Sequence, residues 1–270
     1  MIQRAIAVLR SRGVWGLLRV TYSRLRSLNA GRAKSFAPNK HHFAEKSGIE
    51  IGGPSAVFSA RGMFPVYSLV KNLDNCNFSD ATIWGESSAN GGTYFFHPGK
   101  PLGRQHIGES SMLHQLLAGT YDFVLSSHML EHTANPLLAL SLWKKLLTDN
   151  GLLALVLPNK SHTFDHRRPV TTLEHLIEDF QAGMPEDDLT HLPEILALHD
   201  LKRDPDAGDI DSFKSRSMRN FENRSLHHHV FDRRLAVSVV EYVGLELCAA
   251  EEIAPHHILV LARKPPSSLL

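Results

Sequence analysis

The sequence predicts an α/β fold with a doubly wound sheet, a helical insertion and a C-terminal antiparallel hairpin. A buried strand at 121–126, a helix-spaced segment at 136–147 and a second buried strand at 152–157 follow one another with short links. Such a unit indicates a right-handed parallel crossover. Two closing strands, at 245–251 and 257–262, predict the hairpin.

Shorter signals predict the other strands. Residues 48–51 form a short apolar strand, and residues 66–73 form a second extended segment that ends at Asp74. Residues 85–104 are rich in Gly and Pro, which indicates a loop. A third short strand is expected at 105–108.

Helices are expected mainly in the second half of the chain. The insertion covers about residues 165–224, is polar, and contains helix-spaced segments at 172–180 and 210–223. An N-capping aspartate and a closing glycine bound a further helix at 233–242.

The composition excludes several classes of protein. Of the 270 residues, 43% are hydrophobic and 21% are charged, which is ordinary for a globular protein with a full core. Two cysteines cannot form a disulfide framework. Because no apolar run reaches about 20 residues, no membrane-spanning helix is expected.

The net charge of +1 combines two unlike parts of the chain. Residues 1–44 hold nine Arg and Lys residues and no Asp or Glu, so the rest carries 20 basic against 28 acidic residues. We expect a basic N-terminal helical arm and linker at 1–46 and one domain at 47–270. An acidic domain would repel phosphates, so no nucleic-acid partner is expected.

Three interpretations of the basic arm stay open. Residues 1–28 alternate apolar residues with arginines, which fits peripheral contact with an anionic membrane. The same pattern fits an organellar targeting segment. It also fits a helical extension that packs on the domain.

Ligands of open α/β sheets bind beyond the carboxyl ends of the strands. The first strand runs into Gly52 and Gly53, where the backbone can approach a ligand closely, and Glu50 precedes them. Asp74 follows Gly53 by about 20 residues, the spacing at which an acid binds the ribose of a nucleotide cofactor. The alternative is a tight turn without a ligand.

A longer segment resembles a known family. Tyr121-Asp122-Phe123-Val124-Leu125-Ser126 leads through Ser127-His128 into Leu130-Glu131-His132, and Asn150-Gly151 precedes the next strand. Together these residues are similar to class I S-adenosylmethionine-dependent methyltransferases, which have a Rossmann-like sheet. The resemblance covers about residues 47–160 and resumes at 229–262.

The resemblance implies S-adenosylmethionine as the cofactor and assigns its binding residues. Glu50, Gly52 and Gly53 would lie at its methionine end, and Asp74 would bind the ribose hydroxyls. Glu109 and Ser110 would lie near the adenine. Ser126, Ser127 and His128 would line the pocket near the sulfonium. Glu131 and His132 are interpreted as residues that brace a loop.

The acceptor is expected in the loop that follows the strand at 152–157. Asp165 and His166 are the candidate general bases there, with His229 across from them, and Arg167 and Arg168 could clamp an anionic group of the acceptor. The alternative is a salt-bridged loop that holds the insertion. No metal is expected, because none of the 17 histidines shows a strong ligand spacing.

We therefore predict a cytoplasmic enzyme, membrane-associated if the arm binds lipid. Its reaction would be O-methylation of a small polar or glycan-type acceptor, with the insertion as a lid. Two departures from the family pattern, Pro54 and the unmatched segment 75–104, leave a non-catalytic binding or scaffold protein as the alternative. A nicotinamide-dependent oxidoreductase is disfavoured because Gly-x-Gly-x-x-Gly is missing.

Overall fold

A computed structural model describes residues 31–79, 81–82, 85–86, 91–109 and 114–267. Most of the basic arm lies outside these residues, so its three interpretations stay predictions. None of the described helices has the length and hydrophobicity needed to span a bilayer.

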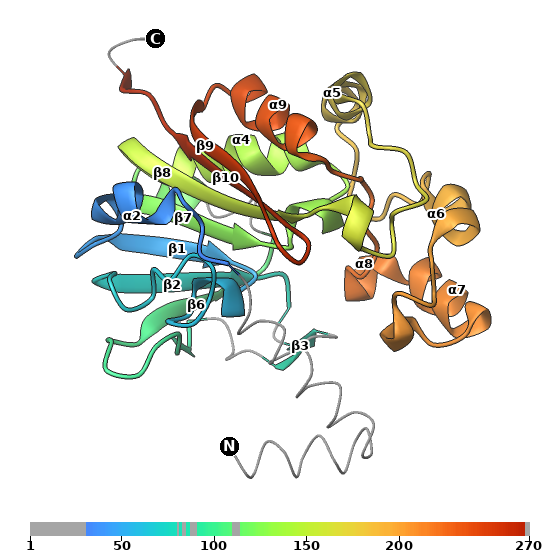
Figure 1. Cartoon of the computed structure of the whole chain (residues 1–270), viewed down its shortest axis with the longest axis horizontal. Helices are drawn as coiled ribbons and strands as arrows, with labels where there is room; N and C mark the ends of the chain where they lie inside the picture. Colours follow the sequence, from blue (N-terminus) through green and yellow to red (C-terminus); the bar gives the residue numbers. More distant parts are fainter. Residues whose placement is uncertain (1–30, 80, 83–84, 87–90, 110–113, 268–270) are drawn as a thin grey trace.

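The described residues form an eight-stranded sheet with the order β5-β6-β2-β1-β7-β8-β10-β9 (Figure 1). Strands β6, β2, β1, β7 and β8 are parallel, whereas β5, β10 and β9 each run antiparallel to a neighbour. The bounds are β1 Ser47–Ile51, β2 Asn72–Asn77, β5 Thr93–Tyr94, β6 Gly103–Ile107, β7 Tyr121–Ser127, β8 Leu147–Pro158, β9 Glu246–Ile253 and β10 His257–Arg263. A separate two-stranded hairpin pairs β3 (Ala81–Thr82) with β4 (Gly85–Glu86).

The parallel crossover and the antiparallel hairpin were predicted correctly, but the second strand was not. It was expected at 66–73 and is instead Asn72–Asn77. The apolar residues Val66, Tyr67 and Val70 are buried as part of a loop that covers the sheet. The true strand is polar, since Asn75 donates a hydrogen bond to Gln105 of β6 and accepts one from Gly53.

Alternate strand residues pack into two cores on opposite faces of the sheet. Helices α4 (Pro136–Leu146), α5 (Leu173–Ala182) and α9 (Arg233–Tyr242) contribute to the core of one face. On the other face the core is formed largely by loop residues, with short helical turns at Phe36–Asn39 (α2), Lys40–His42 (η1) and Ala56–Phe58 (η2). Both faces of the parallel strands are therefore covered, as their continuous apolar sequences require.

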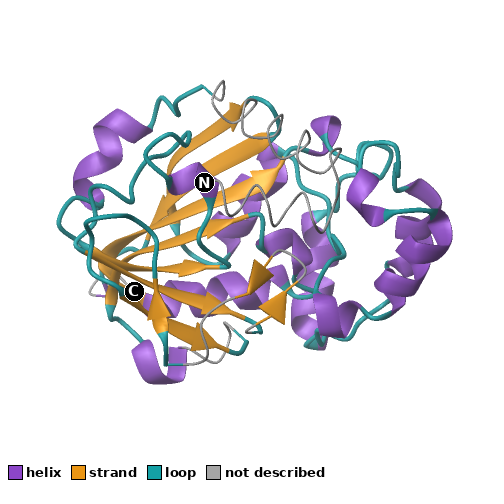
Figure 2. Ribbon diagram, turned by 90° about the horizontal axis from the view of Figure 1, so that it is seen from below, coloured by secondary structure: helices purple, strands orange, loops and turns teal. Residues whose placement is uncertain are grey.

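The insertion forms a group of short helices to the side of the sheet, beyond the carboxyl ends of the parallel strands (Figures 1 and 2). The predicted helix at 172–180 is α5, and the predicted helix at 210–223 is broken at Arg219 into two helices. The remaining helices are α3 His114–Leu117, η4 Leu130–His132, η5 Lys160–His162, α6 Leu192–Leu198, η6 Pro205–Ala207, α7 Ile210–Met218 and α8 Asn220–Asn223. A small core of Ile195, Ala207, Phe213 and Leu226 holds α6 to α7.

Arg168 connects the insertion to the rest of the domain. Its side chain is buried and donates hydrogen bonds to Asp165 Oδ1 at 3.0 Å and to Glu194 Oε1 at 2.8 Å. It also donates to the carbonyls of His227 and His228 at 2.7 and 2.9 Å. The expected clamp on an acceptor is therefore wrong for Arg168, because its donors face acceptors inside the protein.

We predict that Arg168→Lys lowers the free energy of unfolding by about 3 kcal/mol, because a single ammonium cannot reach acceptors on three chain segments. Denaturant unfolding measures the difference. The control is Arg167→Lys, whose half-exposed side chain pairs with Asp200 and should change stability by less than about 1 kcal/mol. Equal stability of the two variants would contradict the role of Arg168.

Candidate functional site

Two cavities lie at the carboxyl edge of the sheet. The first cavity has a volume of about 250 Å³ and includes residues from the ends of β1, β2 and β6 and from α4. Its lining includes Ile51, Phe78, Glu109, Trp143, Glu186 and Arg224. Arg224 pairs with both Glu109 and Glu186, so one cation lies between two carboxylates in this cavity.

The second cavity has a volume of about 650 Å³ and lies between the ends of β7 and β8 and the insertion. Its lining includes His128, Glu131, His132, His227 and His256, together with Phe164, Asp204, Asp206 and Arg216 from the insertion side. His132 lines both cavities, so the two meet at this residue.

Glu50 does not line either cavity. Its buried carboxylate accepts hydrogen bonds from Tyr67 Oη at 2.6 Å, Tyr94 Oη at 2.7 Å and the Ser55 amide at 3.0 Å. Burial raises its pKa, against the effect of these donors. Glu50 therefore holds the loop that follows β1, and its contact with the methionine end of a cofactor stays a prediction.

Gly52 and Gly53 belong to that loop. Gly52 has a φ of +83°, and a Cβ there would collide with the side chain of Met129. Its amide donates to the Cys76 carbonyl, and the amide of Gly53 donates to Asn75 Oδ1. The two glycines are therefore needed because other segments of the chain approach them closely. This requirement holds with or without a ligand.

Asp74 is not at the carboxyl edge of the sheet, so its prediction as the ribose-binding acid is wrong. It is the third residue of β2, and its carboxylate accepts hydrogen bonds from the Arg104 amide and from Tyr121 Oη, both at 2.8 Å. Tyr121 is the first residue of β7, which places Asp74 toward the amino edge. The spacing argument failed because β2 continues to Asn77.

The other predicted cofactor residues are divided between several places. Glu109 lines the first cavity, whereas Ser110 lies outside the described residues. Ser126 and Ser127 are buried at the end of β7. His128 lines the second cavity, with its Nε2 2.9 Å from Nδ1 of His257.

The three predicted catalytic residues do not converge. His166 Nε2 lies 2.9 Å from Asp200 Oδ2, and His229 Nε2 lies 3.1 Å from the Ala134 carbonyl. Neither of these histidines lines the second cavity. Asp165 reaches it indirectly, because its Oδ2 is hydrogen-bonded to Nδ1 of His227. His166 and His229 therefore lie apart from the second cavity, whereas His227, which sequence reasoning did not predict as a general base, lines it.

Asp165 and His227 form a buried dyad. Burial alone would raise the pKa of Asp165, but His227 and Arg168 lower it to about 2. Burial alone would lower the pKa of His227, but the charge of Asp165 and their hydrogen bond raise it above its usual value. Because Asp165 binds the Nδ1–H, the Nε2 of neutral His227 is left as a proton acceptor at the second cavity.

Glu131 lies beside this dyad. It is fully buried, and neither carboxylate oxygen accepts a hydrogen bond from the described residues. His128 Nδ1 lies 3.6 Å and His227 Nε2 lies 4.0 Å from its Oε1. Burial raises the pKa of Glu131 to about 7. Glu131 and His132 thus belong to the lining of the second cavity, in addition to the loop that they were expected to brace.

Two imidazoles of the second cavity, those of His128 and His132, have lowered pKa values. Burial lowers the pKa of His128 and of His132 well below the usual value, and neighbouring imidazoles lower both further. His227 differs from His128 in that a carboxylate, Asp165, lies at hydrogen-bond distance from its ring. The arrangement can therefore take a proton at one defined atom.

Comparison with known proteins supports the predicted class. The model of a family described as a methyltransferase domain matches residues 25–208, more than half of the chain. No curated protein sequence matches.

Solved structures show more distant similarity. One described as PigF with SAH is 12% identical, covering 95% of this chain and 68% of its own, with a TM-score of 0.42. A chain of the complex between the Haloferax volcanii Trm112 methyltransferase activator and a methyltransferase is 10% identical over 92% and 93%, with a TM-score of 0.49. A SAM-dependent methyltransferase from Methanosarcina mazei is 13% identical over 84% and 96%, with a TM-score of 0.48.

Because these TM-scores are below 0.5, the family assignment is based on the match to the family model and on the strand order of the sheet. The chain therefore belongs to the methyltransferase-domain family and is a class I S-adenosylmethionine-dependent methyltransferase.

Proposed function

We propose that this enzyme transfers a methyl group to a hydroxyl of a small, sugar-type acceptor in the second cavity. The Asp165–His227 dyad is the observation that carries the proposal, because a proton acceptor is needed when the methyl acceptor is a hydroxyl. A neutral amine could be methylated without such a base.

The first cavity fits the cofactor chemically. S-adenosylmethionine supplies an electrophilic methyl group on a positively charged sulfur. Its ammonium and carboxylate suit Glu109, Glu186 and Arg224, and the flat ring of Trp143 suits an adenine. The buried and unpartnered oxygens of Glu131 suit a nearby positive charge.

The dyad gives the proton of the acceptor a defined destination. Nε2 of His227 takes the hydroxyl proton as the oxygen becomes the nucleophile, and Asp165 stabilises the imidazolium that results. Arg168, which donates to Asp165 Oδ1 and to the His227 carbonyl, keeps both partners in place.

The lining of the second cavity suits a molecule with several hydroxyls. Asp204 and Asp206 can accept hydrogen bonds from such hydroxyls, and Arg216 can donate to them. The ring of Phe164 offers an apolar surface to the face of a sugar. The volume of about 650 Å³ suits a small acceptor.

Calorimetry with S-adenosylmethionine tests the cofactor part of the proposal. Incubation with ¹³C-methyl-labelled cofactor and a panel of sugars, amines and carboxylic acids then tests the acceptor part. A new methyl ether signal in NMR spectra would support O-methylation. Folded protein that binds no cofactor, or labels only amines or carboxylates, would contradict the proposal.

We predict that His227→Gln lowers kcat by about 10²–10⁴-fold while calorimetric affinity for the cofactor stays unchanged, because only the proton acceptor is lost. In the wild type, kcat should rise with pH through an apparent pKa above 6.5, since the base must be neutral and Asp165 raises its pKa. The control is His166→Gln, which should keep wild-type kcat. An equal loss in both variants would remove His227 from catalysis.

We predict that Glu131→Gln stabilises the ligand-free protein at pH 8. The pKa of Glu131 is about 7 in the folded protein against 4.5 ordinarily, so stability falls as pH rises between these values and stays low above them. The substitution removes this penalty of at most about 3 kcal/mol. Melting at pH 8 and pH 4 measures it, and the gain should vanish at pH 4. Glu178→Gln, at an exposed side chain, should change neither value.

A further inference from the structure

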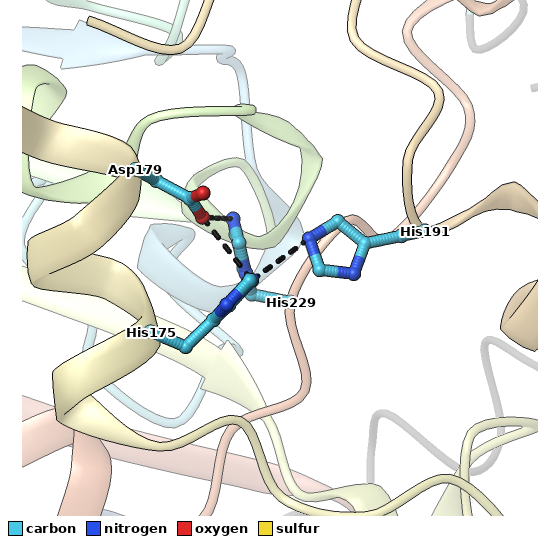
Figure 3. Close-up of side chains that lie close together, drawn as sticks. All are labelled: His175, Asp179, His191 and His229. Atoms are coloured by element: carbon cyan, nitrogen blue, oxygen red, sulfur yellow. Dashed lines mark hydrogen bonds and ion pairs between the residues drawn. The ribbon is translucent and has the colours of Figure 1, made fainter. Parts of the chain in front are cut away.

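Outside the two cavities, three imidazoles and one carboxylate point toward a common centre (Figure 3). His175 and Asp179 are four residues apart on α5 and so share one face of that helix. His191 comes directly before α6, and His229 lies in the segment before α9. One nitrogen or oxygen from each residue lies within 4.8 Å of the others.

Three of the separations are close to those between ligands of a tetrahedral metal ion. Nε2 of His175 lies 3.1 Å from Nε2 of His191 and 3.3 Å from Oδ2 of Asp179. Nε2 of His229 lies 3.7 Å from the same oxygen. Nitrogen and oxygen ligands about 2.0–2.1 Å from zinc are about 3.3 Å apart at the corners of a tetrahedron.

Asp179 provides a second, independent observation. Its side chain is 96% buried, with an exposed fraction of 4%, and Oδ2 accepts no hydrogen bond from the described residues. Its neighbours are the imidazoles of His175 at 3.3 Å and His229 at 3.7 Å, and burying a carboxylate oxygen that accepts no hydrogen bond costs free energy unless a cation compensates for it. Figure 3 shows the oxygen directed at the imidazoles of His175 and His229.

We propose that His175, Asp179, His191 and His229 bind a zinc ion. Three imidazoles and one carboxylate are a ligand set that zinc accepts, and four protein ligands make a closed, structural site. His229 Nε2, now 3.1 Å from the Ala134 carbonyl, ligates the ion, and the ring proton then resides on Nδ1. This proposal differs from the expectation, drawn from the sequence, that the chain binds no metal.

The ion would cross-link three segments of the chain. It would join α5 to the start of α6 and to the segment before α9, where His227 lies two residues before His229. Binding therefore favours the folded arrangement of the insertion and holds the segment that carries His227. The site is separate from the methyl-transfer chemistry and does not depend on it.

A route to the site is open from the surface. A third cavity of about 460 Å³ is lined by His175 and His191 together with Thr172, Thr190 and Glu194. The His175 side chain is 38% exposed, so an ion can reach the centre without unfolding of α5.

Zinc titration of the full chain, stripped of metal by a chelator, tests the proposal. We expect one ion per chain, a higher melting temperature with Zn²⁺, and the intense visible absorption of a tetrahedral site when Co²⁺ replaces it. His191→Ala should weaken zinc binding by more than about 100-fold and abolish the rise in melting temperature. This variant should fold, because the half-buried His191 side chain caps no helix.

The matched control is His162→Ala, which removes an exposed histidine of η5 that is outside the proposed site and should bind zinc like the wild type. Asp179→Asn should weaken binding as His191→Ala does. The proposal is overturned if the wild type binds no zinc, or if His191→Ala keeps wild-type affinity. In the latter case the ion lies elsewhere, for example among Glu131, His132 and His227.

Discussion

The buried guanidinium of Arg168 is the interaction on which the functional half of this protein depends. It binds Asp165 in the loop after β8, Glu194 on α6 and two consecutive carbonyls before α9. A buried cation of this kind is tolerated only when most of its donors have partners, which forces the three segments into one arrangement. That arrangement places His227 beside Asp165 and brings His229 toward α5.

The site that results is not optimised for stability. Glu131 is buried and accepts no hydrogen bond from the described residues, and burial raises its pKa to about 7, next to His128, whose pKa burial lowers. Buried titratable groups with shifted pKa values persist when the surrounding structure is rigid enough to hold them. They are common at sites where a charged ligand supplies the opposite charge. A positively charged cofactor in the adjoining cavity would do so here, while zinc would compensate Asp179 in the same way.

Much of the fold could be predicted from local patterns. The strand at β7, the helix α9 and the closing hairpin have strong periodicity and clear caps, and the structure has them within about two residues. The second strand could not be predicted in this way. Its polar residue Asn75 has its hydrogen-bond partners in β6 and in the loop of Gly52 and Gly53 that follows β1. The error at Asp74 follows from this, since that prediction depended on where the second strand ends.

The sequence alone determined the class of the protein: a parallel crossover, a glycine loop after the first strand and a Leu-Glu-His segment indicate a class I methyltransferase. Only the tertiary structure decided which of the 17 histidines lie close together. Asp165 and His227 are 62 residues apart, and no spacing rule relates residues on separate loops. Local propensities depend on neighbours a few residues away, whereas a proton acceptor or a metal site requires atoms about 3 Å apart, and only the packing of the whole chain fixes that distance.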